Sequence, residues 1–269
     1  MIELPKSIGT IGAGNMAEAI LEGLLRAGLS PDQLIASDPS DGRRAHLEER
    51  LAIRTTTSNE EVCSASEVVV LAVKPNVVEA AVAAVRGSRD NLFLSIAAGL
   101  PLARLREFLG ADARVIRAMP NTPALISRSI TAIAEDPASS PQDLERAAAV
   151  LQAIGTVVRV PESQLDAVTG LSGSGPAYVY VFIEALTDAG IREGLSSDIA
   201  RTLAIETTVG AAHMVRKSDE HPAVLRDRVS SPGGTTVAGL AALEARGLRS
   251  AVLEAVRAAT QRSRELAGS

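Results

Sequence analysis

The sequence predicts an α/β fold: a doubly wound parallel sheet followed by a small all-α domain. The first half of the 269-residue chain alternates short β-branched runs with amphipathic stretches, as strand–helix–strand units do. A glycine-rich turn separates the first predicted strand from the first predicted helix. Composition changes near Pro161, and no convincing strand follows it. We therefore expect two domains, residues 1–161 and residues 162–269.

The first domain begins with a strand over residues 7–11 and a helix over residues 15–27, which Gly28 ends. Residues 68–73 are all apolar, which is typical of a parallel strand covered on both faces. Further strands are expected over residues 34–37, 92–96, 115–119, 129–134 and 156–160, the last two at the far edge of the sheet. Further helices are expected over residues 41–51, 77–85, 101–109 and 143–153.

The second domain is predicted to be helical over residues 177–189, 198–216, 237–245 and 249–266. Between Leu203 and Val215 the second of these helices carries a single charge, Glu206. A helix that is apolar on all sides is normally buried all round, and a small helical domain offers little room for that. We therefore expect a partner subunit to cover it.

Composition and charge exclude several classes of function. Lys and Arg number 27 against 32 Asp and Glu, a net charge of −5, which argues against nucleic acid and anionic membrane as partners. No apolar stretch is long and continuous enough to span a bilayer. Cys63 is the only cysteine and the three histidines are scattered, so we expect no metal site. The N-terminal sequence lacks a signal-peptide pattern, and we expect a cytoplasmic protein.

The glycine-rich turn fits the pattern G-x-G-x-x-A. The first glycine would allow a tight turn, the second a close approach of pyrophosphate, and the final alanine close packing of helix on strand. These features predict a Rossmann-type dinucleotide-binding domain; a tight strand–helix turn without a ligand is the alternative. The motif residues are Gly12, Ala13, Gly14, Asn15, Met16 and Ala17.

Asp38 ends the second predicted strand, where ribose hydroxyls are usually recognised. A carboxylate there favours NAD, because it repels a 2′-phosphate. Arg43 and Arg44 follow closely, however, and an arginine in this place can hold a 2′-phosphate. Alternatively, Asp38 and Ser40 cap the next helix.

Three further loops follow predicted strands, where ligands sit in open α/β sheets. One is Ala72, Val73, Lys74 and Pro75, in which Lys74 is aimed at the crevice or simply solvated. The second, residues 97–99, consists of small residues that suit a flat ring. The third, residues 119–124, holds Asn121, which offers both a donor and an acceptor; a rigid connection is the alternative.

Two helix starts in the second domain are rich in glycine. Residues 172–177 place a proline near the first turn, as helix starts prefer. In residues 230–236 the glycines leave a run of backbone N–H groups uncovered, which makes an anion nest suited to a carboxylate. Ordinary N-capping by Ser and Thr is the alternative.

Five motifs together resemble pyrroline-5-carboxylate reductases: IGAGNMA, AVKP, MPNTPA, GSGPAY and SSPGGTT, in that order along nearly the whole chain. The resemblance implies reduction of the cyclic imine 1-pyrroline-5-carboxylate to L-proline, the last step of proline biosynthesis, with NADPH or NADH. It also implies that the helical domain is a dimerisation domain, and that homodimers assemble further, as far as decamers. NADPH is expected to be moderately preferred.

The resemblance also assigns residue roles. The substrate carboxylate would rest on backbone N–H groups between Ser231 and Thr235, and Thr236 would hydrogen-bond or protonate the ring nitrogen as the catalytic residue. The implied substrate-binding residues are Asn121, Val229, Ser231, Gly233, Gly234, Thr235 and Thr236. The implied cofactor-binding residues are the six of the glycine motif with Asp38, Asn59, Ala72, Val73, Lys74, Pro75, Ala97, Gly99, Met119 and Pro120.

Two other functions compete with this interpretation. A β-hydroxyacid dehydrogenase would use a catalytic lysine on a helix of the second domain. Lys217 is the only lysine after Lys74, and we expect it beyond the end of its helix, which argues against that chemistry. A non-enzymatic dinucleotide-binding relative is the other alternative, and the intact SSPGGTT loop disfavours it.

Overall fold

The computed structural model describes residues 4–267 and divides the chain into two compact units. The sheet unit runs up to Ser174 and includes the chain from Ala258 onward. The helical unit is Gly175–Arg257. The division into domains between residues 161 and 162 stays a prediction.

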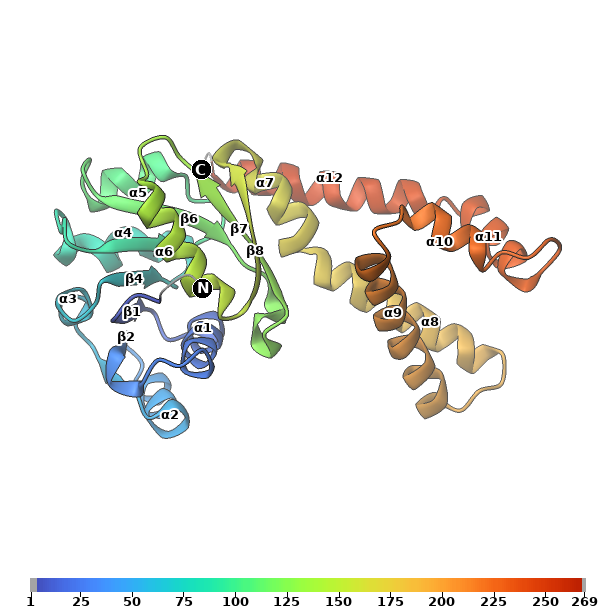
Figure 1. Ribbon diagram of the computed structural model, residues 1–269, viewed down its shortest axis with the longest axis horizontal. Coiled ribbons are helices and arrows are strands. Elements are labelled where there is room, and N and C mark those ends of the chain that lie inside the picture. The colour runs from blue at the N-terminus through green and yellow to red at the C-terminus, as the bar shows by residue number, and fades with distance from the viewer. Residues whose placement is uncertain (1–3, 268–269) are drawn as a thin grey trace. The chain divides into compact units, whose positions relative to one another are not determined.

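The described part of the sheet unit contains one sheet, in the strand order β3-β2-β1-β4-β5-β6-β7-β8 (Figure 1). The first six strands are parallel and follow the order of a dinucleotide-binding fold, with the reversal between β1 and β4. The strands are β1 (Ile8–Ile11), β2 (Leu34–Ser37), β3 (Arg54–Thr56), β4 (Val68–Leu71), β5 (Leu92–Ser95), β6 (Arg114–Met119), β7 (Ser129–Glu135) and β8 (Gly155–Pro161).

Helices cover both faces of this sheet. Along β4, Val68 and Val70 pack into one buried cluster and Val69 and Leu71 into another, as the alternation of a strand requires. The first cluster includes side chains from α1 (Asn15–Arg26), α2 (Asp41–Leu51) and α6 (Pro141–Gln152). The second includes α3 (Asn59–Ser64), α4 (Val78–Val82) and α5 (Leu102–Leu109). The carboxyl ends of the strands thus remain the open edge where a ligand can lie.

Most predicted elements of the first domain are confirmed with small changes of bounds, and the α/β class is correct. β3 and α3 were not predicted, because three polar, partly exposed residues and a six-residue helix are too short to show periodicity. The predicted helix over residues 77–85 is only partly regular: α4 lies between two 3-10 turns.

The expectation of an all-parallel sheet is wrong at one edge. β7 runs antiparallel to β6, and β8 is parallel to β7. The connection from Met119 to Ser129 contains only a 3-10 turn, Thr122–Ile126. A parallel crossover needs a dozen or more residues, so this short connection returns the chain in the opposite direction.

Between Pro161 and the end of the described chain, all the regular elements are helical. They are α7 (Leu165–Val168) with a π-helical turn (Thr169–Gly173), then α8 (Gly175–Arg192), α9 (Ser197–Ser218), α10 (Pro222–Arg228), α11 (Thr235–Ala245) and α12 (Leu248–Ala267). α10 was not predicted. Lys217 lies in the last turn of α9, so its expected place beyond the helix is wrong. None of the described helices is long and apolar enough to cross a membrane.

The helical unit leaves much of its apolar surface uncovered. α8 and α11 bury no residue fully, and α9 buries only Ala200 and Ala204. Within the stretch predicted to be buried all round, Leu203 is 53% exposed and Met214 57% exposed. The single chain therefore does not bury α9.

Candidate active site

The glycine turn follows β1 at the open edge of the sheet. Gly12 has φ +98°, and a Cβ there would lie 2.7 Å from the carbonyl oxygen of Ala72, so only glycine fits. A Cβ on Gly14 would meet nothing within 4 Å. Gly14 is also the N-cap of α1 and supplies no side-chain cap, which leaves the first-turn N–H groups available to an anion. Ala13 and Ala17 are fully buried, as close helix–strand packing requires.

Asp38 ties the loop after β2 to the glycine turn. Its Oδ2 accepts a hydrogen bond from the Ala13 N–H at 2.9 Å, and its Oδ1 accepts one from the Ser40 N–H at 2.9 Å. The helix cap itself is Ser40, whose Oγ accepts from the Arg43 N–H at 3.4 Å. The carboxylate of Asp38 therefore lies beside the turn that would hold pyrophosphate, which is also where a ribose would follow.

Glu18 is a buried carboxylate beside this turn that the sequence analysis did not identify. It accepts hydrogen bonds from Arg43 at 3.0 Å and from Arg50 at 2.6 Å, and Nε2 of His46 lies at 2.9 Å. Arg43 also donates from Nε to the Ala13 carbonyl at 2.7 Å. The sequence leaves open whether an arginine lies near the ribose. In the structure, this bond holds Arg43 against the glycine turn.

The partners of Glu18 also set its ionisation. Burial raises the pKa of the Glu18 carboxyl, but hydrogen bonds from His46 and Arg43 and the charges of His46 and Arg50 outweigh it, and the pKa falls below its ordinary value. Glu18 was missed because a carboxylate in the first turn of a helix is ordinarily explained by the helix dipole.

The other loops at the open edge place their residues differently. Lys74 is exposed, whereas Ala72 and Val73 are partly buried. Ala97 and Gly99 are buried, and Gly99 has φ +72°. Asn59 uses both ends of its amide in the fold: Oδ1 accepts from Ser37 at 2.6 Å and Nδ2 donates to the Ala81 carbonyl at 2.7 Å. Its predicted contact with the cofactor would therefore have to use the hydrogen-bonding capacity of the amide that these two bonds do not use.

Met119, Pro120 and Asn121 end β6. Met119 is partly buried, and Pro120 and Asn121 are buried. The side chain of Asn121 bonds to Ser129, to the Ile130 N–H and to the Ser172 carbonyl. Its amide is thus engaged by the sheet unit itself, and its role as a substrate ligand stays a prediction.

In the helical unit, the loop before α11 presents bare backbone. Gly233 has φ +67°, and the Gly234 N–H donates to the Ser231 carbonyl at 2.9 Å. Gly234 is the N-cap of α11 without a side-chain cap, so the first-turn N–H groups at Thr235 and Thr236 face no intrahelical acceptor. Val229 is 65% exposed, and Thr236 is partly buried. This geometry suits a carboxylate.

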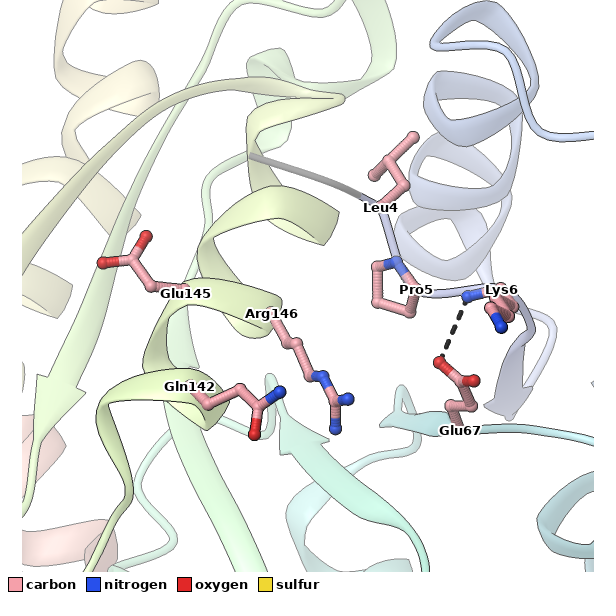
Figure 2. Close-up of a pocket in the computed structure, with 7 residues that line it drawn as sticks. All are labelled: Leu4, Pro5, Lys6, Glu67, Gln142, Glu145 and Arg146. Atoms are coloured by element: carbon pink, nitrogen blue, oxygen red, sulfur yellow. Dashed lines mark hydrogen bonds between the residues drawn. The ribbon is translucent and has the colours of Figure 1, made fainter. Parts of the chain in front are cut away.

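A pocket of about 330 Å³ opens at the opposite edge of the sheet, before the starts of β1 and β4 (Figure 2). It mixes charges of both signs, and the Lys6 backbone N–H donates to Glu67 at 3.2 Å. Its lining residues are Leu4, Pro5, Lys6, Glu67, Gln142, Glu145 and Arg146. None of the predicted site residues is among them, and the amino ends of parallel strands are not where such sheets bind ligands.

The remaining titratable candidates have structural roles. Cys63 is buried, and burial with the nearby Glu60 charge raises the pKa of its thiol to about 11, as for a packing residue. Nε2 of His46 contacts Glu18. His221 caps α10 through Nδ1. Residues 4–267 contain no group of three or more His, Cys, Asp or Glu side chains placed to hold a metal ion.

Comparison with known proteins gives the same family from sequence and from structure. Residues 162–266 match the family model for pyrroline-5-carboxylate reductase dimerisation, and residues 7–99 match that for NADP oxidoreductase, coenzyme F420-dependent. The pyrroline-5-carboxylate reductase of Synechocystis is 47% identical over 261 residues, covering 96% of this chain and 97% of the relative.

Two solved structures are similar over almost the whole chain. Plasmodium falciparum pyrroline carboxylate reductase with NADP bound has a TM-score of 0.88 at 30% identity and covers 99% of both chains. The pyrroline-5-carboxylate reductase of Coxiella burnetii has a TM-score of 0.91 at 32% identity and covers 98% of this chain and 99% of its own. The relatives and the two helix starts without side-chain caps point to the same family. The chain belongs to the pyrroline-5-carboxylate reductase family.

Proposed function

We propose that this protein reduces 1-pyrroline-5-carboxylate to L-proline by hydride transfer from NADPH or NADH. The observation that carries the proposal is the pair of helix starts without side-chain caps, at Gly14 and at Gly234. One suits a pyrophosphate and the other a carboxylate. Relatives that carry the name of this enzyme match the chain over nearly its whole length, which supports the same assignment.

The residues of the sheet unit would bind and orient the dinucleotide. The N–H groups after Gly14 would hold its pyrophosphate, and Asp38 and Arg43 lie where the adenosine ribose would follow. The small residues Ala97 and Gly99, with Met119 and Pro120, would face the nicotinamide. The bound dinucleotide would supply a hydride, that is, one proton with two electrons, to the imine carbon.

The residues of the helical unit would bind the imino acid. Backbone N–H groups between Ser231 and Thr235 would hold its carboxylate, and the Thr236 hydroxyl would hydrogen-bond the ring nitrogen, accepting from its N–H when the imine is protonated. When the imine carbon gains hydride, the C=N π pair moves to nitrogen, which ends as the amine of proline with the proton it holds. A hydroxyl is a weak acid, so positioning of an already protonated imine would matter more than acid strength.

The protein would act as a homo-oligomer, as the family model for its helical region indicates. We propose a dimer formed through the helical unit, because α8, α9 and α11 leave apolar side chains uncovered in one chain. Further assembly to a decamer, a moderate preference for NADPH and a cytoplasmic location stay predictions, as do the individual site residues and the absence of nucleic-acid partners.

The decisive assay is oxidation of NADPH by 1-pyrroline-5-carboxylate with L-proline measured as product. A 3-hydroxy acid with NADP⁺ forms the second arm, because Lys217 in the last turn of α9 is the residue that a β-hydroxyacid dehydrogenase would need on a helix. We expect turnover in the first arm only. Turnover of the hydroxy acid, or binding of NADPH without turnover in either arm, would overturn the assignment.

A further inference from the structure

Asn121 is buried at the end of β6 and makes more hydrogen bonds than a connecting residue needs. It is 8% exposed. Its Oδ1 accepts from Ser129 Oγ at 3.1 Å and from the Ile130 N–H at 3.0 Å. Its own N–H donates to Ser129 Oγ at 3.3 Å. These bonds fix the loop after β6 against the start of β7 and leave the amide nitrogen Nδ2 to reach elsewhere.

That nitrogen reaches the π-helical turn Thr169–Gly173, donating to the Ser172 carbonyl at 3.1 Å. The turn is held internally by the Ser174 N–H on the Thr169 carbonyl at 2.9 Å and by Ser172 Oγ on the Val168 carbonyl at 3.1 Å. π-helical turns are rare and frequently occur at functional sites. Since α8 begins at Gly175, this turn is the last part of the sheet unit before the helical unit begins.

The same turn contacts Met119. A Cβ on Gly173 would lie 2.7 Å from Met119 Cε, closer than real contacts allow. Gly173 therefore gives Met119 the room for its present rotamer, while Asn121, two residues further, is bonded to the neighbouring Ser172. Two independent contacts thus join the end of β6 to one side of the π-helical turn.

We propose that Asn121 is a positioning residue of the reductase, which through its bond to Ser172 holds Met119 and Pro120 in register with the π-helical turn. The inference rests on the proposed function, in which Met119 and Pro120 face the nicotinamide. Asn121 then acts on hydride transfer without touching the substrate. A displacement of about 1 Å at a reacting centre can cost on the order of 100-fold in rate, so holding this loop in place should have a measurable effect on kcat.

The substitution Asn121→Asp isolates the bond in question. The carboxylate keeps an oxygen for Ser129 and the Ile130 N–H, but it faces the Ser172 carbonyl with oxygen where the amide had a donor. We expect kcat to fall about tenfold, with the dissociation constant of NADPH within about twofold of wild type because the glycine turn is unchanged. Gly173→Ala, whose Cβ displaces Met119, should lower kcat in the same way.

Ser172→Ala is the matched control, because it removes a hydroxyl but keeps the carbonyl that Asn121 uses. It should keep kcat within about twofold of wild type. Ser129→Ala removes the other anchor of the Asn121 loop and should lower both the melting temperature and kcat. A kcat loss in Ser172→Ala as large as in Asn121→Asp would show that the bond to the Ser172 carbonyl is not what positions the loop, and would overturn the inference.

The outcomes separate this inference from the proposed function. Wild-type kcat in both Asn121→Asp and Gly173→Ala, with an active wild-type enzyme, overturns the inference and leaves the function intact. A wild-type protein that does not reduce 1-pyrroline-5-carboxylate overturns the function first. If Asn121→Asp fails to fold, Gly173→Ala decides alone, because its added methyl meets the flexible end of Met119 and not backbone.

Discussion

The two units of this chain bury their apolar residues to very different extents. In the sheet unit, every residue of β1, β2, β4 and β5 is buried. In the helical unit, α8, α10 and α11 bury none, although α8 and α11 are rich in apolar residues. Since apolar surface left in water gains nothing from folding, the first unit is complete within one chain, and the second leaves apolar surface that a partner chain can cover.

The largest effect should come from a charge placed on the exposed face of α9. Gly210 is exposed, and a Cβ there meets nothing, so Gly210→Glu leaves the fold of one chain intact. Burying that unpaired charge in an interface would cost several kcal/mol, enough to dissociate the oligomer. We expect light scattering at micromolar concentration to give a monomer.

The control for this prediction lies in the sheet unit. Ala84 is exposed in the 3-10 turn after α4, and Ala84→Glu should leave the oligomer unchanged. A wild-type protein that is already monomeric, or a Gly210→Glu variant that stays assembled, would contradict the view that α9 is covered by a partner.

The next largest effect concerns Thr236. If its hydroxyl contacts the ring nitrogen in the transition state, Thr236→Ala should lower kcat by roughly 10- to 1,000-fold. Thr236→Ser keeps the hydroxyl and should recover much of that loss. Steady-state kinetics on the folded variants, with NADPH titrated separately, measures both. Wild-type kcat in Thr236→Ala would remove Thr236 from the mechanism and leave the proton to water.

A smaller effect is expected at Asp38, in the sheet unit. Asp38→Asn removes a charge that repels a 2′-phosphate but keeps only one side-chain oxygen, so either the Ala13 N–H or the Ser40 N–H loses its acceptor. The ratio of kcat/KM for NADPH over NADH should rise by roughly 3- to 10-fold. Asp41→Asn, at a carboxylate that is 94% exposed and paired with Arg44, is the control and should leave the ratio unchanged. Equal gains for both cofactors would show that Asp38 does not read the ribose.

The smallest effect is on stability, through Glu18. Because its pKa is lowered in the folded state, the ionised carboxylate stabilises the fold above its ordinary pKa of 4.5, and this stabilisation is lost as pH falls through the lower, folded-state pKa. Glu18→Gln should therefore lower the melting temperature at pH 7 by roughly 2–4 °C. Calorimetry should show the gap from wild type closing in acid.

Glu22→Gln is the matched control for Glu18. Its carboxylate lies on the same helix, is 30% exposed and contacts Arg26 and Arg50 but not Arg43. It should change the melting temperature less at every pH. A gap for Glu18→Gln that widens as pH falls would contradict the sign of the pKa shift.

The same contrast explains how far the sequence alone could lead. Repeating apolar runs and the glycine turn predicted the sheet, because strands buried on both faces leave a continuous signal. The direction of β7 was not predicted, since it depends on the length of a connection and not on strand composition. In the helical unit the sequence predicted helices correctly but not α10, which is only seven residues long.

The predicted site residues also differ in how much the sequence alone could say about them. Gly12 and Gly14 were identified because backbone geometry there requires their residue type, and the structure shows the close approach and the open space expected of them. In the sequence, the side-chain amides of Asn59 and Asn121 look the same whatever surrounds them. Only the fold shows that groups from distant parts of the chain already form hydrogen bonds with these amides. Besides its ordinary place in the first turn of a helix, Glu18 was hard to identify because its three partners all come from α2.

The central claim is that the sheet unit binds the dinucleotide and the helical unit binds the imino acid. A crossed measurement tests it: titration of NADPH and the KM for 1-pyrroline-5-carboxylate in Gly12→Ala and Gly234→Val. A Cβ at Gly234 would lie 2.3 Å from Ser231 Oγ, so valine disrupts the loop before α11, just as alanine at Gly12 meets the Ala72 carbonyl.

We expect Gly12→Ala to weaken NADPH binding, and Gly234→Val to raise the KM for the imino acid at least about tenfold with NADPH binding unchanged. If Gly234→Val weakened NADPH binding as much as it raised that KM, or left both unchanged, the division of work between the two units would be wrong.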